Sequence, residues 1–234
     1  MWWNRRSAEK EWMDLESYDQ KAYADCLWQL DRVGQYLGGD KATFRALKTL
    51  SSNPKSILDV GCGGGFFAAK LAKKFPKTQV VGIDISTDAI KFAKNRFENA
   101  TFPNLSFMVK NILEDKFSHQ VFDIVTSTLV FHHLTDEEIP LMLKGLCQQA
   151  NQAVIINDLH RHALAYYGFA LLSPLLFRNR MVFHDGLISI KRAFTREDWM
   201  SYLNKAKIPV SNISLKWNWA FRWILQIDTS RELI

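Results

Sequence analysis

The stretch ILDVGCGGGFF, residues 57–67, decides the fold. A short apolar run, interrupted by Asp59, leads directly into four glycines within five positions. The apolar run predicts a buried strand, and glycines let a chain turn tightly and bring its backbone against a ligand. A helix that follows such a turn presents unpaired N–H groups. We therefore expect a strand, a ligand-binding turn containing Gly61, Gly63 and Gly65, and a helix.

Strand-like and helix-like segments alternate on both sides of this turn. Strands are predicted over residues 56–60, 79–85, 105–111, 122–131 and 152–159, and helices over 64–75, 86–99 and 135–150. This alternation is typical of right-handed βαβ units and predicts a parallel sheet covered on both faces. A later helix, 195–206, begins with Thr195 and Asp198 spaced as a capping box, and residues 211–228 are expected to form a closing hairpin. The fold class is therefore α/β, with a doubly wound, mostly parallel sheet of seven strands.

Two regions lie outside this alternation. Residues 8–50 carry apolar side chains at helical spacing, so residues 1–50 are expected to form a helical cap on a main domain of residues 51–234. Residues 160–194 are longer than a crossover needs and are predicted to be an inserted lid. Within it, residues 163–177 are almost wholly apolar, interrupted by Pro174 and flanked by arginines and a lysine. They form either an apolar wall for an acceptor or an ordinary core helix.

Composition narrows the class of protein. No run of 18 apolar residues and no secretory signal is visible, so a cytoplasmic protein is expected. The three cysteines have no CxxC spacing, which argues against a disulfide framework and a zinc cluster. Residues 160–222 hold 10 basic and 3 acidic side chains, whereas the two charges balance over residues 1–159. This excess indicates either a site for an anionic group or a solvated basic face.

The residues around the glycine turn favour a particular kind of ligand. Phe66 stands where a dinucleotide fingerprint requires its last glycine, and Asp59 suits an ammonium group better than a pyrophosphate. Asp84 ends the second predicted strand, where its oxygens can accept hydrogen bonds from ribose hydroxyls. Ile85 offers an apolar face to adenine, and Asn111-Ile112 can contact the adenine edge. Together they favour a nucleoside that carries an amino acid and disfavour a nicotinamide oxidoreductase.

The motifs ILDVGCGGG, VVGIDIS, NILE and FDIVTSTLVFHHL, in this order, resemble those of the class I S-adenosylmethionine-dependent methyltransferases over residues 55–160. The resemblance implies a Rossmann-like methyltransferase fold and S-adenosyl-L-methionine as cofactor. It also implies that Asp59 and the glycine turn bind the methionine end, Asp84 the ribose and Asn111-Ile112 the adenine. Thr128 would lie beside the methionine. Many members of the family have aspartate where this chain has Asn111, but an amide can also hydrogen-bond to adenine.

A methyl acceptor with a hydroxyl must lose a proton, which directs attention to histidines. His132 and His133 end the fourth predicted strand, and because neighbouring residues of a strand point in opposite directions, at most one should face the methyl group. His160 follows the fifth strand, and His184 stands beside Asp185, which can orient its imidazole. Each of them can equally be a satisfied polar group or a helix-cap partner. His119 is a weaker candidate.

Other motifs restrict the acceptor. No Asn/Asp-Pro-Pro-aromatic tetrad follows the fourth strand and no Pro-Cys pair is present, which disfavours methylation of nucleic-acid bases. Carboxylates at the ends of both the fourth and fifth strands are typical of metal-dependent catechol enzymes, but Thr128 occupies the first of these places. No metal is therefore required. The pattern NDL…R…DG…S…RAFT resembles a bacterial subgroup of small-molecule methylases related to quinone biosynthesis, and implies that His184, Asp185 and Arg192 contact the acceptor.

These observations predict metal-independent methyl transfer to a small hydrophobic, phenolic or quinol-like acceptor, on oxygen or carbon. Contact with the surface of a membrane is compatible with the apolar insertion, and a nucleic-acid partner is not favoured. The alternatives are a nucleic-acid or protein methyltransferase, drawn by the basic last third, and a cofactor-binding module without catalysis. The sequence leaves the acceptor and the oligomeric state open.

Overall fold

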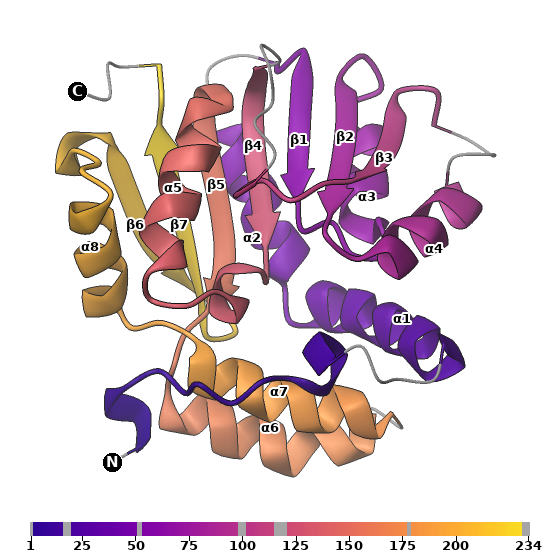
Figure 1. The fold of residues 1–234 in the computed structure, drawn as a ribbon, viewed down its shortest axis with the longest axis vertical. Helices are drawn as coiled ribbons and strands as arrows, with labels where there is room; N and C mark the ends of the chain where they lie inside the picture. Colours follow the sequence, from indigo (N-terminus) through magenta and orange to yellow (C-terminus); the bar gives the residue numbers. More distant parts are fainter. Residues whose placement is uncertain are drawn as a thin grey trace.

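The computed structural model describes residues 2–15, 20–50, 53–97, 102–114, 121–176 and 179–230. Its strands form one sheet in the order β3-β2-β1-β4-β5-β7-β6 (Figure 1). The strands are β1 (Ser56–Val60), β2 (Gln79–Asp84), β3 (Leu105–Val109), β4 (Phe122–Thr128), β5 (Ala150–Leu159), β6 (Ile213–Asn218) and β7 (Arg222–Asp228). Only β7 runs against its neighbours β5 and β6. The predicted seven-stranded, mostly parallel sheet is confirmed.

Helices cover both faces of the sheet because successive strand residues point in opposite directions. Ile57 and Val80 pack with α2 (Gly39–Lys48), α3 (Phe66–Lys74) and α4 (Thr87–Phe97). Leu58 and Val81 face the other way, toward α5 (Glu138–Gln148) and α8 (Arg196–Lys205). The two cores therefore fix the sheet between two helical layers, and only the ends of the strands are left for a site.

A cap lies across the carboxyl ends of the parallel strands (Figure 1). It consists of α1 (Gln20–Tyr36), α6 (Ala163–Leu176), α7 (Arg180–Arg192) and the N-terminal segment with the 3-10 turn η2 (Trp12–Leu15). The insertion predicted over residues 160–194 is therefore a pair of helices, α6 and α7, which pack on each other. No helix among the described residues is long and apolar enough to cross a membrane.

The helices predicted for residues 8–50 are only partly correct. α1 and α2 are present, but residues 6–11 form no helix, and η2 is a short 3-10 turn. The amides of Trp12 and Met13 donate to the Asp185 carboxylate at 2.8 and 3.1 Å, and the Ser7 amide donates to the Lys191 carbonyl at 3.1 Å. Side chains and carbonyls of α7 thus bind the amides of this segment, which therefore lies along α7. We call residues 7–15 the strap.

Two further boundaries differ from the prediction. The fourth strand was expected to reach residue 131, but β4 ends at Thr128 because Leu129 has φ of 59°, the left-handed region. A 3-10 turn, η3 (Phe131–His133), follows. In the insertion, the prediction that Pro174 interrupts the apolar segment is wrong, because α6 continues through Pro174 to Leu176. The predicted capping box of Thr195 and Asp198 is confirmed.

The packing between sheet and α8 gives a test of the core. Trp199 is fully buried, with its ring centroid 4.3 Å from that of Phe194 and 5.6 Å from that of Phe131. Trp199→Ala is expected to lower the free energy of unfolding by about 3–5 kcal/mol because it leaves a large cavity. Trp199→Phe is the matched control, and it should lower the free energy of unfolding by roughly half as much or less. It keeps ring contacts and removes an indole N–H that has no partner among the described residues.

Urea unfolding followed by circular dichroism measures both variants. Equal losses for Trp199→Ala and Trp199→Phe, or a loss below about 1 kcal/mol for the alanine variant, would contradict this description of the core.

Candidate functional site

A cavity of about 1630 Å³ lies between the carboxyl edge of the sheet and the cap. It is bounded by the loop after β1, by the ends of β2, β3 and β4, and by residues of α1, α6, α7 and the strap. Sites for one small ligand are commonly about 300–1,000 Å³. The cavity is therefore large enough for two ligands side by side.

The glycine loop forms one wall of this cavity. The Gly61 and Cys62 amides donate to the Ile83 carbonyl at 2.8 and 2.9 Å, which ties the loop to the end of β2. Gly61 has φ of 71°, and a Cβ there would lie 2.2 Å from Val130, so only glycine fits. At Gly63 a Cβ would meet nothing nearer than 3.9 Å, so the bare backbone faces open space. Gly65 does not line the cavity, because its Cβ position is filled by Phe107.

Asp84 connects the loop with the second strand. Its carboxylate accepts from the Gly63 amide at 2.8 Å and from the Ser86 amide at 2.9 Å. Burial raises the pKa of Asp84 despite these hydrogen bonds. A carboxylate has about four acceptor positions, and the Ile85 amide also interacts with Asp84, so at least one position remains for a ligand.

Residues after β2 and β3 continue the same wall. Ile85 is 71% exposed and borders the cavity, as do Asn111 and Ile112 beyond β3. Asn111 accepts from the Leu113 amide at 3.0 Å through its side-chain oxygen. Ile112 packs against the core formed by the sheet and α5. An apolar side chain, an amide and a carboxylate thus lie along one edge of the cavity.

The opposite side of the loop contains Asp59, Thr126 and Thr128. Asp59 is buried and accepts a hydrogen bond from the Thr126 hydroxyl at 2.9 Å. Burial raises the pKa of Asp59 to about 7, and the hydrogen bond from Thr126 opposes the shift. Thr128 also borders the cavity, and its hydroxyl has no hydrogen-bond partner among the described residues.

His132 and His133 both border the cavity, and the extended segment from which we predicted that at most one of them faces the methyl group is absent. They belong to the 3-10 turn η3 and not to a strand, so their side chains do not alternate. Their ring centroids lie 4.3 Å apart. The left-handed Leu129, which ends β4, allows this arrangement.

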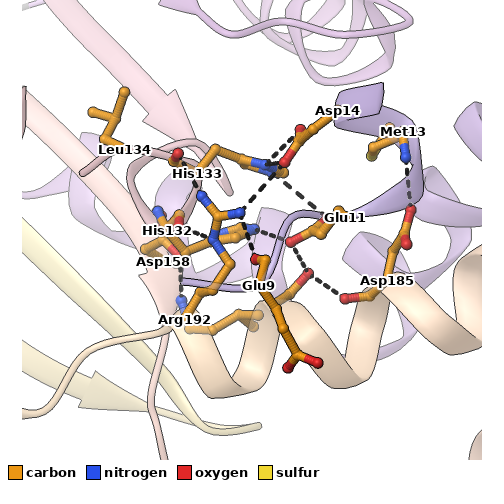
Figure 2. A network of polar contacts seen from close by, with 12 residues as sticks. Glu9, Glu11, Met13, Asp14, His132, His133, Leu134, Asp158, Asp185 and Arg192 are labelled. Carbon is orange, nitrogen blue, oxygen red and sulfur yellow. Dashed lines mark hydrogen bonds and ion pairs between the residues drawn. The ribbon is translucent and has the colours of Figure 1, made fainter. Parts of the chain in front are cut away.

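Carboxylates surround the two imidazoles (Figure 2). His132 Nδ1 lies 2.7 Å from Asp158 Oδ1, and His133 Nδ1 lies 3.1 Å from Asp14 Oδ1. Glu11 faces the other nitrogens, with its two oxygens 3.7 Å from His132 Nε2 and 3.9 Å from His133 Nε2. Burial disfavours the charged form of His133, but the carboxylates of Glu11 and Asp14 outweigh burial and raise its pKa. Burial likewise opposes ionisation of Asp158, yet the contact with His132 lowers its pKa.

Arg192 holds the backbone of this turn. Its guanidinium donates to the carbonyls of His132 at 2.7 Å, His133 at 2.5 Å and Glu9 at 2.9 Å. Arg6 adds hydrogen bonds to the carbonyls of His132 at 3.2 Å and Leu134 at 2.9 Å. Arg192 borders the cavity, as predicted for an acceptor contact, but most of its donors are occupied by the chain itself.

The other predicted polar residues make contacts that leave them little part in the cluster of imidazoles and carboxylates, although His160 borders the cavity. His184 and Asp185 are in contact at 2.9 Å, as the sequence suggested, but neither lines the cavity. Asp185 binds the strap, and the His184 ring stacks on Trp12 at 3.9 Å, so the pair anchors the strap instead of facing an acceptor. His160 accepts from the Trp217 indole, and burial lowers its pKa to about 4. His119 and Arg178 lie outside the described residues.

Sequence reasoning missed Glu11 and Asp14 and gave Asp158 no role beside the histidines. Glu11 is 121 positions from His132, and no pattern connects the two. The residues around Glu11 include Glu9, Lys10 and Asp14, so the local sequence did not distinguish it from a surface carboxylate. The structure makes it 2% exposed and hydrogen-bonded to the Ser189 hydroxyl at 2.8 Å.

Comparison with known proteins is consistent with this geometry. Residues 51–164 match the family model described as a methyltransferase domain. A malonyl-[acyl-carrier protein] O-methyltransferase of Legionella pneumophila is 32% identical over 111 residues, 47% of this chain and 37% of that protein. A 2-phytyl-1,4-naphtoquinone methyltransferase of Nostoc sp. is 33% identical over 121 residues, 50% of this chain and 52% of that protein. The matches span about a third to a half of the length of these relatives.

Solved structures extend the likeness to almost the whole chain. The plantazolicin methyltransferase BpumL, in complex with a monoazolic desmethylPZN analog and SAH, superposes with a TM-score of 0.70 at 18% identity, covering 94% of this chain and 93% of that one. Magnesium protoporphyrin IX methyltransferase from Synechocystis gives a TM-score of 0.55 at 20% identity and covers 84% of each chain. At these identities the likeness concerns the fold. The chain therefore carries, over residues 51–164, a methyltransferase domain, and its sheet has the fold of the S-adenosylmethionine-dependent methyltransferases.

Proposed function

We propose that the protein transfers a methyl group from S-adenosylmethionine to a small, largely apolar acceptor with a polar head, on oxygen or carbon. The observation that carries this proposal is the juxtaposition, in one cavity, of the glycine loop with Asp84 and of the histidine pair with its carboxylates. The first group suits the donor. The second suits a group that must lose a proton.

The donor side fits the cofactor by its chemistry. The bare backbone at Gly63 leaves room that a Cβ would fill, and Asp84 keeps at least one acceptor position for a hydroxyl group. Ile85 and Asn111 offer an apolar face and an amide to a purine. Asp59 would attract the ammonium group of the methionine end, and the unpaired Thr128 hydroxyl is also on this side. Gly61 allows the close approach of the loop to Val130.

The sulfonium of the donor supplies an activated methyl group, so the protein must chiefly align the acceptor and receive its proton. We assign these tasks to the cluster of His132, His133 and Glu11. Asp158 and Asp14 would orient the imidazoles through their Nδ1 atoms, and Arg192 would position the turn through its carbonyls. His184 and Asp185 would act on the site only by fixing the strap that carries Glu11.

The cap side of the cavity favours an apolar acceptor. Its wall is formed largely by aliphatic and aromatic side chains from α1, α6 and α7, namely Leu27, Leu30, Phe169, Leu172, Val182 and Ile190. Such a wall suits the body of a phenol, a quinol or an acyl chain, while the polar head would reach the histidines. Relatives named as naphthoquinone and malonyl-[acyl-carrier protein] methylases are compatible with acceptors of this kind.

A polymeric acceptor is less well supported by the charges. Of the basic residues that give the last third its excess, Arg161, Arg192 and Arg222 are buried. Arg161 donates to the Trp3 carbonyl and forms an ion pair with Asp198 at 2.8 Å. Because these three guanidinium groups are buried, they offer no surface to phosphates.

Helix α6 supports the predicted contact with a membrane surface. It contains no charged residue, and Tyr167 and Leu171, which do not line the cavity, are 58% and 75% exposed. Exposed apolar side chains on one helix can enter the interfacial layer of a bilayer. Because α6 also borders the cavity, an acceptor dissolved in a membrane would have a short path to the histidines.

Transfer of a labelled methyl group tests the proposed function. The protein is incubated with methyl-labelled S-adenosylmethionine and extracts of the cells from which it comes, and the extract is then fractionated. Label is expected in a lipid or phenolic fraction, and label that sediments with membranes would support the contact through α6. Label confined to RNA or to amino-acid side chains of proteins, as distinct from an acyl group carried on a protein, or no transfer to any fraction, would contradict the proposal.

The raised pKa of Asp59 gives a prediction for pH. Asp59 is mainly neutral at pH 6 and mainly ionised at pH 8, because burial raises its pKa to about 7. Since the ionised form attracts the donor's ammonium group, the affinity for S-adenosylhomocysteine should rise about tenfold over this range. Calorimetry measures it, with Asp59→Asn as the control, whose affinity should change much less with pH. A flat profile for the natural protein, or the same slope in both, would contradict the role of Asp59.

A further inference from the structure

We propose that Glu11, His132 and His133 bind a divalent transition-metal ion at the acceptor end of the cavity. The role of the ion in methyl transfer rests on the proposed function, whereas the binding of the ion does not. It departs from the metal-independent mechanism expected from the sequence. That expectation considered only the ends of β4 and β5, whereas Glu11 comes from the strap.

Three ligand atoms converge on one point. One atom each from Glu11, His132 and His133 lies within 4.8 Å of the others (Figure 2). The two Nε2 atoms lie 3.7 and 3.9 Å from the Glu11 oxygens. These distances are too long for hydrogen bonds and slightly longer than the roughly 3.3 Å between ligands on a tetrahedral ion with bonds of about 2.0–2.1 Å. Binding an ion would draw the three side chains closer together.

The outer partners are those that metal-binding histidines normally have. Asp158 contacts His132 through Nδ1, and Asp14 contacts His133 through Nδ1, so both Nε2 atoms are left toward Glu11. Ligating histidines usually donate their other ring nitrogen to a carboxylate, which fixes the tautomer. The Ser189 hydroxyl donates to Glu11 at 2.8 Å and would orient this third ligand. The three ligands and the side chains that contact them therefore both match a metal site with two imidazoles and one carboxylate.

The charges favour a cation in the same place. Glu11 and Asp158 are 2% and 0% exposed, and Asp14 lies beside them. Among the described residues, the Arg192 guanidinium lies 3.5 Å from the Asp14 carboxylate. Its other N–H groups donate to backbone carbonyls. Buried carboxylates are normally paired or bound to metal. A divalent ion between the two imidazoles would be attracted by these three carboxylates.

Two imidazoles and a carboxylate are suited to Zn²⁺, Fe²⁺ or Mn²⁺, whereas Mg²⁺ prefers oxygen ligands only. Three protein ligands leave a position open, as in catalytic sites. Because the site borders the cavity, the open position is available to a hydroxyl of the acceptor. A bound ion would lower the pKa of that hydroxyl and hold its oxygen in place.

The test measures the binding of the metal ion in the absence of methyl donor and acceptor. The full chain, freed of any tag and stripped with a chelator, is titrated with Zn²⁺ alone, with Mg²⁺ as a comparison, by calorimetry and by metal analysis after dialysis. One Zn²⁺ per chain and no binding of Mg²⁺ at similar concentrations are expected. Thermal unfolding should shift upward with Zn²⁺ in the natural protein.

Variants locate the site. Glu11→Gln and His133→Ala should each weaken Zn²⁺ binding by more than about 100-fold, and Asp158→Asn by about 10- to 100-fold. Glu9→Gln makes the same chemical change as Glu11→Gln on the same strap, where Glu9 pairs with Lys191 at the surface, and should leave binding unchanged. Circular dichroism shows whether each variant folds.

Less than about 0.1 Zn²⁺ per chain, or equal loss in Glu9→Gln and Glu11→Gln, would overturn the proposal. The imidazoles would then serve as ion-pair partners of the carboxylates. Methyl transfer that proceeds without bound metal would leave the proposed function intact and remove only the ion. Zn²⁺ binding without any methyl transfer would leave the metal site intact and contradict the proposed function.

Discussion

The hydrogen bond from the Gly63 amide to the Asp84 carboxylate, at 2.8 Å, holds together the parts on which the site depends. It joins the loop after β1 to the end of β2, and the amides of Gly61 and Cys62 add hydrogen bonds to the Ile83 carbonyl. Parallel strands bring both ends to one edge of the sheet, so the loop has a fixed place relative to Asp84. A glycine at 63 then leaves the cavity wall as bare backbone. The donor side of the site follows from these constraints.

The side of the cavity that we propose for the acceptor is formed in a different way. The left-handed Leu129 ends β4 early and directs the chain into the turn that holds His132 and His133. Asp185 on α7 binds the amides of the strap, which then carries Glu11 and Asp14 to the histidines. Cap and sheet are therefore joined through polar contacts at the site itself. Loosening the strap would remove the carboxylates without changing the sheet.

Much of the fold could be predicted because its signals are local. The apolar strands, the glycine turn and the capping box at Thr195 each depend on a few neighbouring residues, and the structure contains all of them. Asp84, Asn111 and Thr128 could be placed at the cavity because parallel strands end at one edge. Their roles toward the donor stay predictions. Gly65 was grouped with the ligand-binding glycines because spacing alone does not reveal that Phe107 fills the place of its side chain.

The rest could not be predicted because it depends on contacts between distant segments. The strap is not helical, since its amides are bound by α7, and helical spacing in the sequence gave no sign of this. The orientation of the two histidines depends on the φ angle of Leu129, which a leucine rarely adopts. His184 and Asp185 are adjacent and in contact, yet the face of α7 on which they lie turns them to the strap. Only the packed cap shows which polar residues share the cavity.

The central claim is that the loop and Asp84 bind a nucleoside that carries an amino acid. Calorimetry of the natural protein and of Asp84→Asn with S-adenosylhomocysteine and with NADH tests it most directly. We expect one S-adenosylhomocysteine per chain, no binding of NADH, and an affinity about 10- to 100-fold lower in Asp84→Asn, because hydrogen bonds to a charged group are lost. Unchanged affinity in a folded Asp84→Asn, or binding of NADH alone, would contradict the account.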